Sequence, residues 1–394
     1  MALSLPEEEV RDRGPRVYWI LIALFGVGAL ILYLYHLATG FTPDRVAFTI
    51  EAIGLDVYWY GIIITAGIAL GAYVVAELAG IRAVAEWQAV VPAELRQEPI
   101  NTLSLPEEIE AILDRNRIRT TGELLFWWGV EPDRLGLNAE GREQVAQRLL
   151  AQRAVDPAWV ERPPWYQWAP GHVWTGLFWC LILAVVGARL YHVLTPSPSM
   201  GITPADYFRN PLQLINLRRG GLGIYGGIAG GALGLFLYTF RRRISALRWA
   251  DLGVVGLTLG QFIGRWGNFV NQELYGRPTD LPWAVTIDPS HRLDAYVEFS
   301  RFHPAFLYES LWNLLAFLAL YYLATRLWHR LLPGELMGLY LILYGVGRIL
   351  TETVRLDSNT VAIGSINVAV ATVVSLVIAL VAAGWLSFRR VRSR

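Results

Sequence analysis

Five polar residues cluster in a short stretch of the sequence that directly follows an apolar run of membrane type. From position 264 to 277 the chain reads Gly-Arg-Trp-Gly-Asn-Phe-Val-Asn-Gln-Glu-Leu-Tyr-Gly-Arg. An arginine at the centre of a membrane helix costs about 2.5–3.5 kcal/mol on insertion scales, so such residues normally face a polar cavity. We therefore expect this stretch to line a site, and its polar members are Arg265, Asn268, Asn271, Glu273 and Arg277.

The residue types in this stretch suit a phosphate ester. Arg265 and Asn268 are three positions apart and share one helix face. A guanidinium group offers a fixed fork of donors to a phosphate, and amides bind ester oxygens or a glycerol hydroxyl. An arginine that reaches to lipid headgroups is the simpler interpretation. It explains one guanidinium group, but it leaves the two asparagines and the glutamate unexplained.

A second polar face is predicted on the apolar run at 335–352. Tyr344, Arg348, Glu352 and Arg355 follow one another at i, i+4, i+8 and i+11, and Glu352 stands one turn from Arg348 as its expected ion partner. A purely structural ion pair is the alternative. We favour a functional role because two separate runs each bring an arginine to the outer half of the bilayer.

His303 and Tyr60 are two further candidates, and both lie where a membrane helix is expected to begin. His303 precedes Pro304 at the start of an apolar run, where it either caps the helix or acts as an acid–base group. Tyr60 opens another run. There an aromatic belt at the membrane surface competes with a site hydroxyl as the explanation.

The composition places these residues in a membrane protein. The 394-residue chain is 54% hydrophobic and 17% charged, with a net charge of +1, so nothing in its charge indicates a nucleic-acid partner. All of its basic residues are arginine. The single cysteine, Cys180, lies in an apolar run and is expected to be a small packed residue.

Eight apolar runs of about twenty residues predict an all-α polytopic membrane protein with about eight transmembrane helices. The first run is too long for a signal peptide and lacks a small-residue cleavage site, so we expect it to be retained. The predicted spans are 17–39, 57–81, 172–194, 221–240, 249–269, 304–327, 335–352 and 363–386.

Arginine clusters predict the orientation of these spans. The clusters at 241–243, 326–330 and 389–394 belong in the cytoplasm, and counting spans back from the last one places both termini there. Arg218 and Arg219 then fall outside, which makes them candidates for binding an anion, with a solvated pair as the alternative. The segments expected outside, as a small extracytoplasmic (periplasmic) head, are 195–220, 271–303 and 353–362.

The whole chain divides into four parts. Residues 84–171 contain several acidic residues and prolines, with helical patterns at 105–115 and 138–154, and we interpret them as a soluble helical insert in the cytoplasm. Residues 1–46 form an extra N-terminal transmembrane helix, and 389–394 form a basic cytoplasmic tail. The membrane core is then made of 47–83 and 172–388.

Two predicted spans carry glycine at every fourth position. This spacing puts the glycines on one helix face and lets backbones approach closely, so the two helices are expected to pack on each other. The outer glycine pairs, Gly220-Gly221 and Gly226-Gly227, have the alternative of offering backbone N–H groups to an anion. The two rows are Gly223, Gly227 and Gly231, and Gly256, Gly260 and Gly264.

Taken together, these motifs resemble the bacterial prolipoprotein diacylglyceryl transferase family. The most specific piece is the run from Gly264 to Gly276, and the resemblance covers roughly 47–83 and 172–386. The supporting pieces, in chain order, are Phe48-Thr-Ile with Tyr58-Trp-Tyr-Gly61, Gly187-Ala-Arg-Leu190, Gly220-Gly-Leu-Gly-Ile-Tyr-Gly-Gly227, His303-Pro-Ala-Phe-Leu-Tyr-Glu309, and Tyr344-Gly-Val-Gly-Arg348 with Glu352.

The resemblance implies an enzyme of the inner membrane that works without cofactor or metal. It would move the diacylglyceryl group of phosphatidylglycerol onto the lipobox cysteine of a preprolipoprotein signal peptide and release glycerol phosphate, the first step of lipoprotein maturation. Arg265 and Arg348 would bind the phosphate. The residues implied to shape or orient the substrate site are Tyr60, Gly226, Gly227, Asn268, Asn271, Glu273, Gly276, Tyr344 and Glu352.

One position departs from the family pattern. Tyr225 stands where many members have a histidine that is proposed to accept the thiol proton. Tyrosine, with a reference pKa of about 10 against about 6.5 for histidine, is a poor base at neutral pH. The catalytic assignment therefore stays open between Tyr225, His303 and no single base.

Two functions from other classes compete with this interpretation. A lipid or anion transporter also uses intramembrane arginines and glycine-rich helices, but no inverted repeat is visible and the polar residues gather at one membrane face. A non-catalytic receptor for signal peptides would explain a cleft, but not paired arginines and asparagines directed at one anion.

Overall fold

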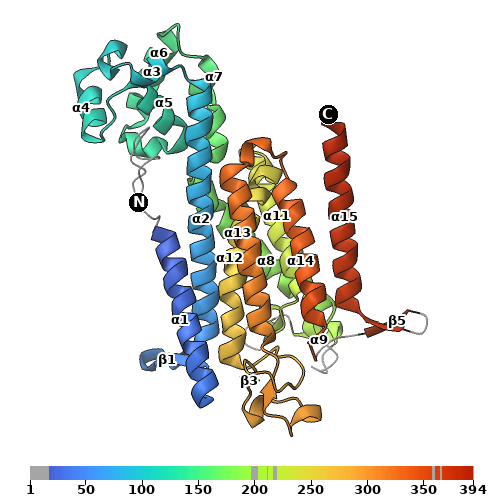
Figure 1. The fold of residues 1–394 in the computed structure, drawn as a ribbon. Helices are drawn as coiled ribbons and strands as arrows, with labels where there is room; N and C mark the ends of the chain where they lie inside the picture. Colours follow the sequence, from blue (N-terminus) through green and yellow to red (C-terminus); the bar gives the residue numbers. More distant parts are fainter. Residues whose placement is uncertain are drawn as a thin grey trace. The chain divides into compact units, whose positions relative to one another are not determined.

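The computed structural model describes residues 17–196, 203–210, 212–215, 220–356, 360–363 and 366–393. In these residues the chain is a series of α-helices joined by loops and three two-stranded antiparallel sheets (Figure 1). It divides into two compact units. We call residues 17–75 with 250–393 the site unit and residues 76–249 the insert unit.

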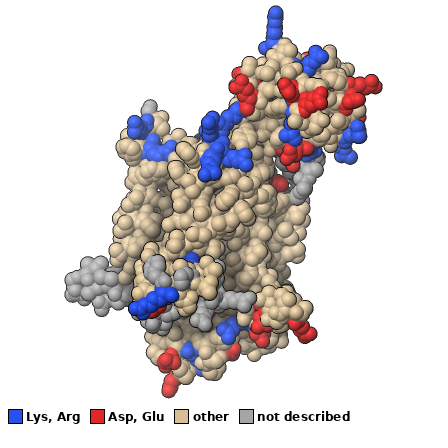
Figure 2. Space-filling model, turned by 180° about the vertical axis from the view of Figure 1, so that it is seen from behind, with Lys and Arg blue, Asp and Glu red and all other residues tan. Residues whose placement is uncertain are grey.

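The prediction of an all-α membrane protein is confirmed. Five helices in the described residues are long and apolar enough to cross a membrane. Figure 2 shows broad areas of surface without Lys, Arg, Asp or Glu side chains. The five helices are α1 (Val17–Thr39), α2 (Trp59–Val90), α8 (Gly171–Leu194), α13 (Ala305–Arg326) and α15 (Val370–Arg392).

The three other predicted spans are also helices, but they are less apolar. They are α11 (Ile224–Arg242), α12 (Ala246–Asn271) and α14 (Glu335–Glu352). Helix α14 carries Glu335, Arg348 and Glu352, and α12 carries Arg265, Asn268 and Asn271. The number of eight spans therefore stays a prediction, although each predicted span has a helix.

The last predicted span begins later than expected. Its first residues form a hairpin in which β5 (Thr360–Ile363) pairs antiparallel with β6 (Ile366–Ala369), and α15 starts only at Val370. The hairpin is rich in Val and Ile, which favour strands, and a short apolar run of this kind reads equally well as part of a helix.

At one end of the site unit, residues 272–304 form a small head between the end of α12 and the start of α13. There β3 (Val285–Thr286) pairs with β4 (Arg301–Phe302), and two short helical turns lie between them. A buried aromatic cluster joins this head to the helices and includes residues of α1, α12 and α13. Its aromatic members are Tyr33, Trp266, Phe269, Tyr275, Phe302 and Phe306. A second hairpin, β1 (Val46–Ile50) with β2 (Leu55–Tyr58), precedes α2.

The opposite end of the site unit is held by charged residues. Asp251 accepts hydrogen bonds from the backbone N–H groups of Gly334 (2.6 Å) and Met337 (2.9 Å), at the start of α14. Glu335 binds the guanidinium group of Arg390. The arginine-rich end of α15 and the loop before α14 therefore lie at one end, as the orientation predicted from the arginines requires.

Each of the two glycine-rich helices packs closely on a neighbour within its own unit, and the expected packing of the two helices on each other stays a prediction. In the insert unit α11 packs on α8 through Gly226 and Gly230, where an added Cβ would lie 2.1 Å from the Gly187 oxygen and 2.0 Å from the Leu183 oxygen. In the site unit Gly256 of α12 packs on Gly71 of α2 in the same way, at 2.7 Å from its oxygen. The glycines of α11 that contact α8 most closely are thus Gly226, Gly230 and Gly234. This row is shifted by one residue from the predicted row of Gly223, Gly227 and Gly231.

The predicted insert is helical, and both helical patterns found in the sequence are present. The first forms α4 (Glu107–Arg115), and the second forms α6 (Ala139–Ala151), which Asn138 caps by accepting a hydrogen bond from the Gly141 N–H at 2.7 Å. Helix α2 continues to Val90, past the expected start of the insert at 84. The other helices are α3 (Ala93–Gln97), α5 (Thr121–Val130), α7 (Pro157–Glu161), α9 (Pro204–Arg209) and α10 (Leu212–Ile215).

Candidate functional site

A buried carboxylate, Glu309 on α13, gathers the arginines that the sequence analysis placed at the site. Its side chain is 8% exposed, and its Oε2 lies 2.7 Å from Nε of Arg265 on α12. Its Oε1 lies 3.2 Å from Nη1 of Arg355, just beyond α14, and 3.8 Å from Nη1 of Arg348. The expected pair on α14 is present as well, because Arg348 Nη2 lies 2.9 Å from Glu352 Oε2.

This cluster has an excess of positive charge. Three guanidinium groups face two carboxylates, so the group as a whole carries about one net positive charge. Arg355 is 10% exposed, whereas Arg265 and Arg348 are 30% and 23% exposed. Arg265 contacts Glu309 through Nε, at the inner end of its guanidinium group. The cluster can therefore receive an anion at Arg265 and Arg348 while Arg355 stays with Glu309.

The asparagines lie directly beside this cluster, at the end of α12. Asn268 donates through Nδ2 to Glu273 Oε1 at 2.8 Å, and Asn271 donates to the same oxygen at 3.4 Å. The backbone N–H of Glu273 in turn donates to the Asn268 carbonyl at 3.0 Å. Gln272 and Leu274 adopt the left-handed conformation, with φ of 52° and 55°, and this sharp turn brings Glu273 back onto the helix.

Tyr60, at the start of α2, packs on the same turn of α12. A Cβ added to Gly267 would lie 2.7 Å from the Tyr60 ring, so glycine is what allows the ring to approach. The predicted site residues Tyr60, Arg265 and Asn268 are thus brought together. Tyr344 is 37% exposed on α14, with its ring 6.1 Å from that of Tyr340.

Gly276 occupies a position where only glycine fits. Its N–H donates to the His303 carbonyl at 2.9 Å, and an added Cβ would lie 2.7 Å from the Val354 oxygen. This close approach ties the head to the residues after α14. The structure therefore gives Gly276 a role in packing, beside the expected role in shaping the substrate site.

His303 does not cap α13 with its side chain. Its Nδ1 lies 3.1 Å from the Tyr308 hydroxyl, which also accepts a hydrogen bond from Trp283 Nε1 at 3.0 Å. Burial, and then the positive charge of Arg277, lower the pKa of His303 below its ordinary value of 6.5. The ring is therefore neutral at pH 7 and can accept a proton or a hydrogen bond.

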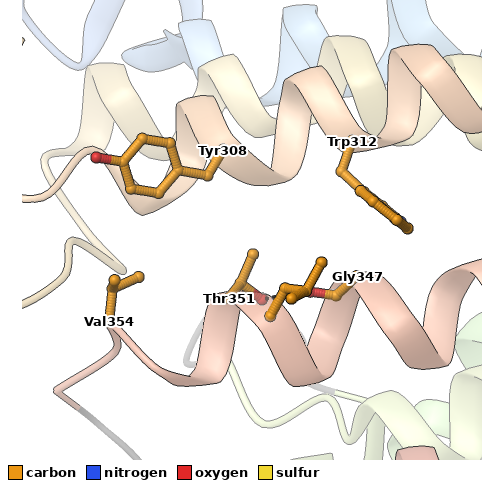
Figure 3. Close-up of a pocket in the computed structure, with 6 residues that line it drawn as sticks. Tyr308, Trp312, Gly347, Thr351 and Val354 are labelled. Atoms are coloured by element: carbon orange, nitrogen blue, oxygen red, sulfur yellow. Dashed lines mark hydrogen bonds between the residues drawn. The ribbon is translucent and has the colours of Figure 1, made fainter.

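A cavity of about 250 Å³ opens between α13 and α14 beside the ion cluster. Figure 3 shows Tyr308 and Trp312 of α13 facing Gly347 and Thr351 of α14 across it. The Trp312 ring lies where a side chain at 347 would be, 2.3 Å from an added Cβ. The lining is mainly apolar, with Leu350 and Val354 completing it.

Tyr225, Gly226 and Gly227 belong to the insert unit. Tyr225 is 59% exposed, with its ring 5.9 Å from that of Tyr191, and Gly226 is closed against Gly187. A Cβ at Gly227 would make an ordinary contact with Ala188, at 3.6 Å.

The glycine pair before this helix has a partner of its own. Arg189, on α8, donates to the carbonyls of Gly220 (3.0 Å) and Gly221 (2.9 Å), which adopt φ of 75° and 80°. The pair thus turns its carbonyl groups toward a guanidinium group. Arg218 and Arg219, the other anion candidates of this segment, lie outside the described residues.

Two residues of the cluster were missed as site residues. Glu309 was noted only as a neighbour of His303, and Arg355 only as a member of the Tyr344 face. The signal for Glu309 was a carboxylate four residues inside an apolar helix, which needs a cationic partner as much as the arginines need an anionic one.

Comparison with known proteins identifies similar chains. Residues 148–388 match the sequence model of a family described as prolipoprotein diacylglyceryl transferase. A phosphatidylglycerol–prolipoprotein diacylglyceryl transferase of Frankia alni is 43% identical over 223 residues, covering 56% of this chain and 53% of the relative. One of Chloroflexus aggregans is 41% identical over 202 residues, covering 48% and 64%.

A relative of the same description from Thermosynechococcus vestitus is 36% identical over 245 residues, covering 62% of this chain and 82% of the relative. By contrast, the chain spans about half the length of the Frankia alni relative, 53%.

Proposed function

The chain belongs to the prolipoprotein diacylglyceryl transferase family, and we propose on that basis that it transfers the diacylglyceryl group of phosphatidylglycerol to the lipobox cysteine of a preprolipoprotein. The observation that carries the proposal is the arginine cluster around Glu309. It combines excess positive charge, partial exposure and an adjoining apolar cavity in helices of membrane type. A lipid that bears a phosphate has the same two parts, an anionic headgroup and apolar chains.

The proposed reaction exchanges one bond for another at a glycerol carbon. The cysteine sulfur attacks the carbon of the diacylglyceryl group that bears the phosphate, and a sulfur–carbon bond forms. The carbon–oxygen bond to the phosphate breaks, its electron pair stays on the phosphate oxygen, and glycerol phosphate leaves. The thiol gives up its proton, so the product is a thioether.

Arg265 and Arg348 stabilise the charge that develops on the departing phosphate. Donors fixed in advance, in a site that excludes water, are worth more than the same donors in water. Glu309 holds both arginines from one side, so each guanidinium group is already oriented when the lipid binds. Glu352 does the same for Arg348 from the other side.

Asn268, Asn271 and Glu273 bind the glycerol headgroup in this proposal. Their amides and carboxylate already form one hydrogen-bonded group beside Arg265, and they offer both donors and acceptors to hydroxyl groups. Tyr60 and Tyr344 border the same region and orient the lipid. Gly226 and Gly227, next to Tyr225 in the sequence, are further proposed substrate-binding residues.

The proton of the thiol needs no strong base. A thiol with a reference pKa of about 8.5 is a few per cent ionised at neutral pH, and nearby guanidinium groups favour the thiolate. In our proposal Tyr225 positions and polarises the reacting groups through its hydroxyl. His303, which is neutral at pH 7, is available to take the proton.

We place the protein in the bacterial inner membrane, with both termini in the cytoplasm. The membrane core (47–83 and 172–388) performs the chemistry, while the first helix and the insert at 84–171 lie outside the motifs. Phosphatidylglycerol and signal peptides that contain a lipobox are the proposed partners.

A reconstitution experiment tests the proposal against its two competitors. Purified protein is incubated with phosphatidylglycerol vesicles and a lipobox peptide, and the peptide mass and free glycerol phosphate are measured. A transferase raises the peptide mass by one diacylglyceryl group and releases glycerol phosphate in equal amount. A transporter or a signal-peptide receptor leaves both unchanged, and this result would refute the proposed function. Replacing the peptide cysteine by serine is the matched control.

A further inference from the structure

The N-terminal helix α1 carries buried polar residues that crossing a membrane does not require. Tyr33 is 4% exposed and His36 is 1% exposed, whereas four leucines of the same helix, Leu21, Leu24, Leu30 and Leu34, are 45–63% exposed. Both polar residues lie in the last two turns of α1, at the end where the head of the site unit lies. Such buried polar groups are costly unless they are hydrogen-bonded, so their partners are informative.

Both partners belong to one segment of the head. Tyr33 donates through its hydroxyl to the Trp283 carbonyl at 2.7 Å, and the backbone N–H of Thr286 donates to His36 Nε2 at 3.0 Å. Since Nε2 accepts, the ring proton is on Nδ1, which lies 2.9 Å from the Phe41 carbonyl that can receive it. Helix α1 thus holds the backbone of 283–286 at two points.

The held segment leads directly to the candidate site. Trp283 donates through its indole Nε1 to the Tyr308 hydroxyl at 3.0 Å, and Tyr308 contacts His303 Nδ1 at 3.1 Å and lines the cavity beside Arg348. A hydrogen-bonded path therefore runs from Tyr33 through Trp283 to Tyr308.

Tyr33 also supports the site from behind. Its ring packs edge-on against Trp266 and Phe269, with centroid distances of 6.3 and 6.0 Å. These two aromatic residues are the direct chain neighbours of Arg265 and Asn268. The face of α12 that carries Trp266 and Phe269 is thus packed against α1. The sequence analysis had set α1 apart from the membrane core.

We propose that α1 is a positioning element of the site, and that Tyr33 is its main positioning residue, acting through Trp283 on Tyr308. The effect on catalysis rests on the proposed transferase function, whereas the effect on the head segment does not. Tyr33 touches no reacting group, so its contribution is to hold residues that do.

The test compares Tyr33→Phe with Tyr18→Phe. Both variants delete one buried phenolic hydroxyl from α1 and keep the ring. Tyr18 bonds to Tyr321 near the beginning of the helix, whereas Tyr33 bonds to the head segment. Backbone hydrogen exchange of peptides covering 281–287 and the kcat/KM of diacylglyceryl transfer are measured for both variants and for the unaltered protein.

We expect Tyr33→Phe to speed exchange in 281–287 and to lower kcat/KM, each by about threefold to tenfold, which is the usual range for one lost neutral hydrogen bond. Tyr18→Phe should leave both unchanged even if it lowers thermal stability. In a Tyr308→Phe background the hydrogen-bonded path is already interrupted. Tyr33→Phe should then lower the logarithm of kcat/KM by at most about half as much as it does in the unaltered protein.

Unchanged exchange in 281–287 would overturn the proposal whatever the activity. In an active protein, an unchanged kcat/KM, or the same loss in both Tyr308 backgrounds, would overturn it as well. If the unaltered protein transfers nothing, the proposed function fails, and the exchange comparison still decides whether α1 holds the head segment.

Discussion

Glu309 shows how a membrane protein keeps several arginines inside one site. Each guanidinium group there would be costly without a counter-ion, and a single carboxylate serves as the shared partner of Arg265, Arg348 and Arg355. The arrangement leaves the two arginines needed for an anion partly exposed. It also makes Glu309 the residue on which the geometry of the cluster depends.

Replacing Glu309 by Gln should destabilise the protein. The change removes the negative charge but keeps the size, and breaking a buried ion pair from one side typically costs about 3–5 kcal/mol. We expect a lower thermal midpoint in detergent, and a larger recovery on adding phosphatidylglycerol than in the unaltered protein, because the unbalanced arginines gain an anion. Glu298→Gln, in an exposed loop, is the control. An unaltered midpoint would mean that Glu309 does not hold the cluster together.

The pH dependence of transfer should follow the substrate thiol and not His303. Burial and Arg277 lower the pKa of His303, so its ring is already neutral above about pH 6.5 and has no titration step between pH 7 and 8.5. Across that window the ionised fraction of a thiol with a reference pKa of about 8.5 rises roughly 16-fold. We expect the rate to rise with pH in the unaltered protein and in His303→Gln alike.

The same assay examines Tyr225. We expect Tyr225→Phe to slow transfer without abolishing it and Tyr225→His to keep activity, because no single residue is an indispensable base. An inactive Tyr225→Phe that still binds lipid would show that the tyrosine itself moves the proton.

The lowered pKa of His303 also determines how its contribution to stability changes with pH. A lowered folded-state pKa gives stability that is present above about pH 6.5 and is lost as the pH falls through the folded-state value.

At the residue level the sequence predicted the arginines but not their shared partner. Arg265 with Asn268 on α12, and Arg348 with Glu352 on α14, follow from spacing within each helix, because a helix fixes which residues share a face. The link from Glu309 to three arginines joins separate helices, and no spacing rule reports which helices are neighbours. For the same reason the roles of Tyr33 and Trp283 could not be predicted.

Among the elements, the insert is the part whose role most needs a direct test. Its last residues are bonded within the insert unit, since Arg162 Nη2 donates to the carbonyls of Arg242 (2.6 Å) and Arg243 (2.8 Å) at the end of α11. Gln167 Nε2 donates to the Glu86 carboxylate of α2 at 2.9 Å. The insert therefore has two parts, one up to residue 160 and one from Arg162 onward that is bonded to α11 and α2.

Replacing residues 92–160 by a flexible linker should leave transfer measurable, with a loss of less than about tenfold, because longer or shorter connections change loop entropy only slowly. Activity and membrane insertion are measured together. A matched variant extends the deletion to residue 168 and should be less stable, because it removes Arg162 and Gln167. Loss of transfer in the shorter deletion, with normal insertion, would show that the insert contributes to the site.

Elements were predicted well where an apolar run has clear ends and poorly where it does not. Residues 17–39 and 335–352 form helices with the predicted bounds, because polar or turn residues flank both runs. The run that starts at 363 continues an apolar strand pattern without a break, so the β5–β6 hairpin was taken for part of a helix. The spacing of the glycines predicted that these helices pack closely, but spacing along one helix does not show which neighbouring helix it packs on.

At the scale of the whole molecule, orientation in the membrane is the main open prediction. Arginine clusters predict cytoplasmic positions for the insert and the C-terminus and an outside position for the head. Reporter fusions at residues 130 and 394 should both report the cytoplasm, and one at 290 the outside. An outside signal at 130 would overturn the predicted order of spans.

The proposed transfer reaction depends on two arginines, Arg265 and Arg348, acting on one phosphate. The most direct test is the rate of diacylglyceryl transfer from phosphatidylglycerol to a lipobox peptide in Arg265→Ala, Arg348→Ala and the corresponding lysine variants. Arg45→Ala, at an exposed position in the same unit, is the control. We predict that each alanine variant loses at least about 2–3 kcal/mol of transition-state stabilisation, roughly 30- to 150-fold in rate, and that lysine restores only part of it. Near-normal transfer by folded Arg265→Ala or Arg348→Ala would contradict the account.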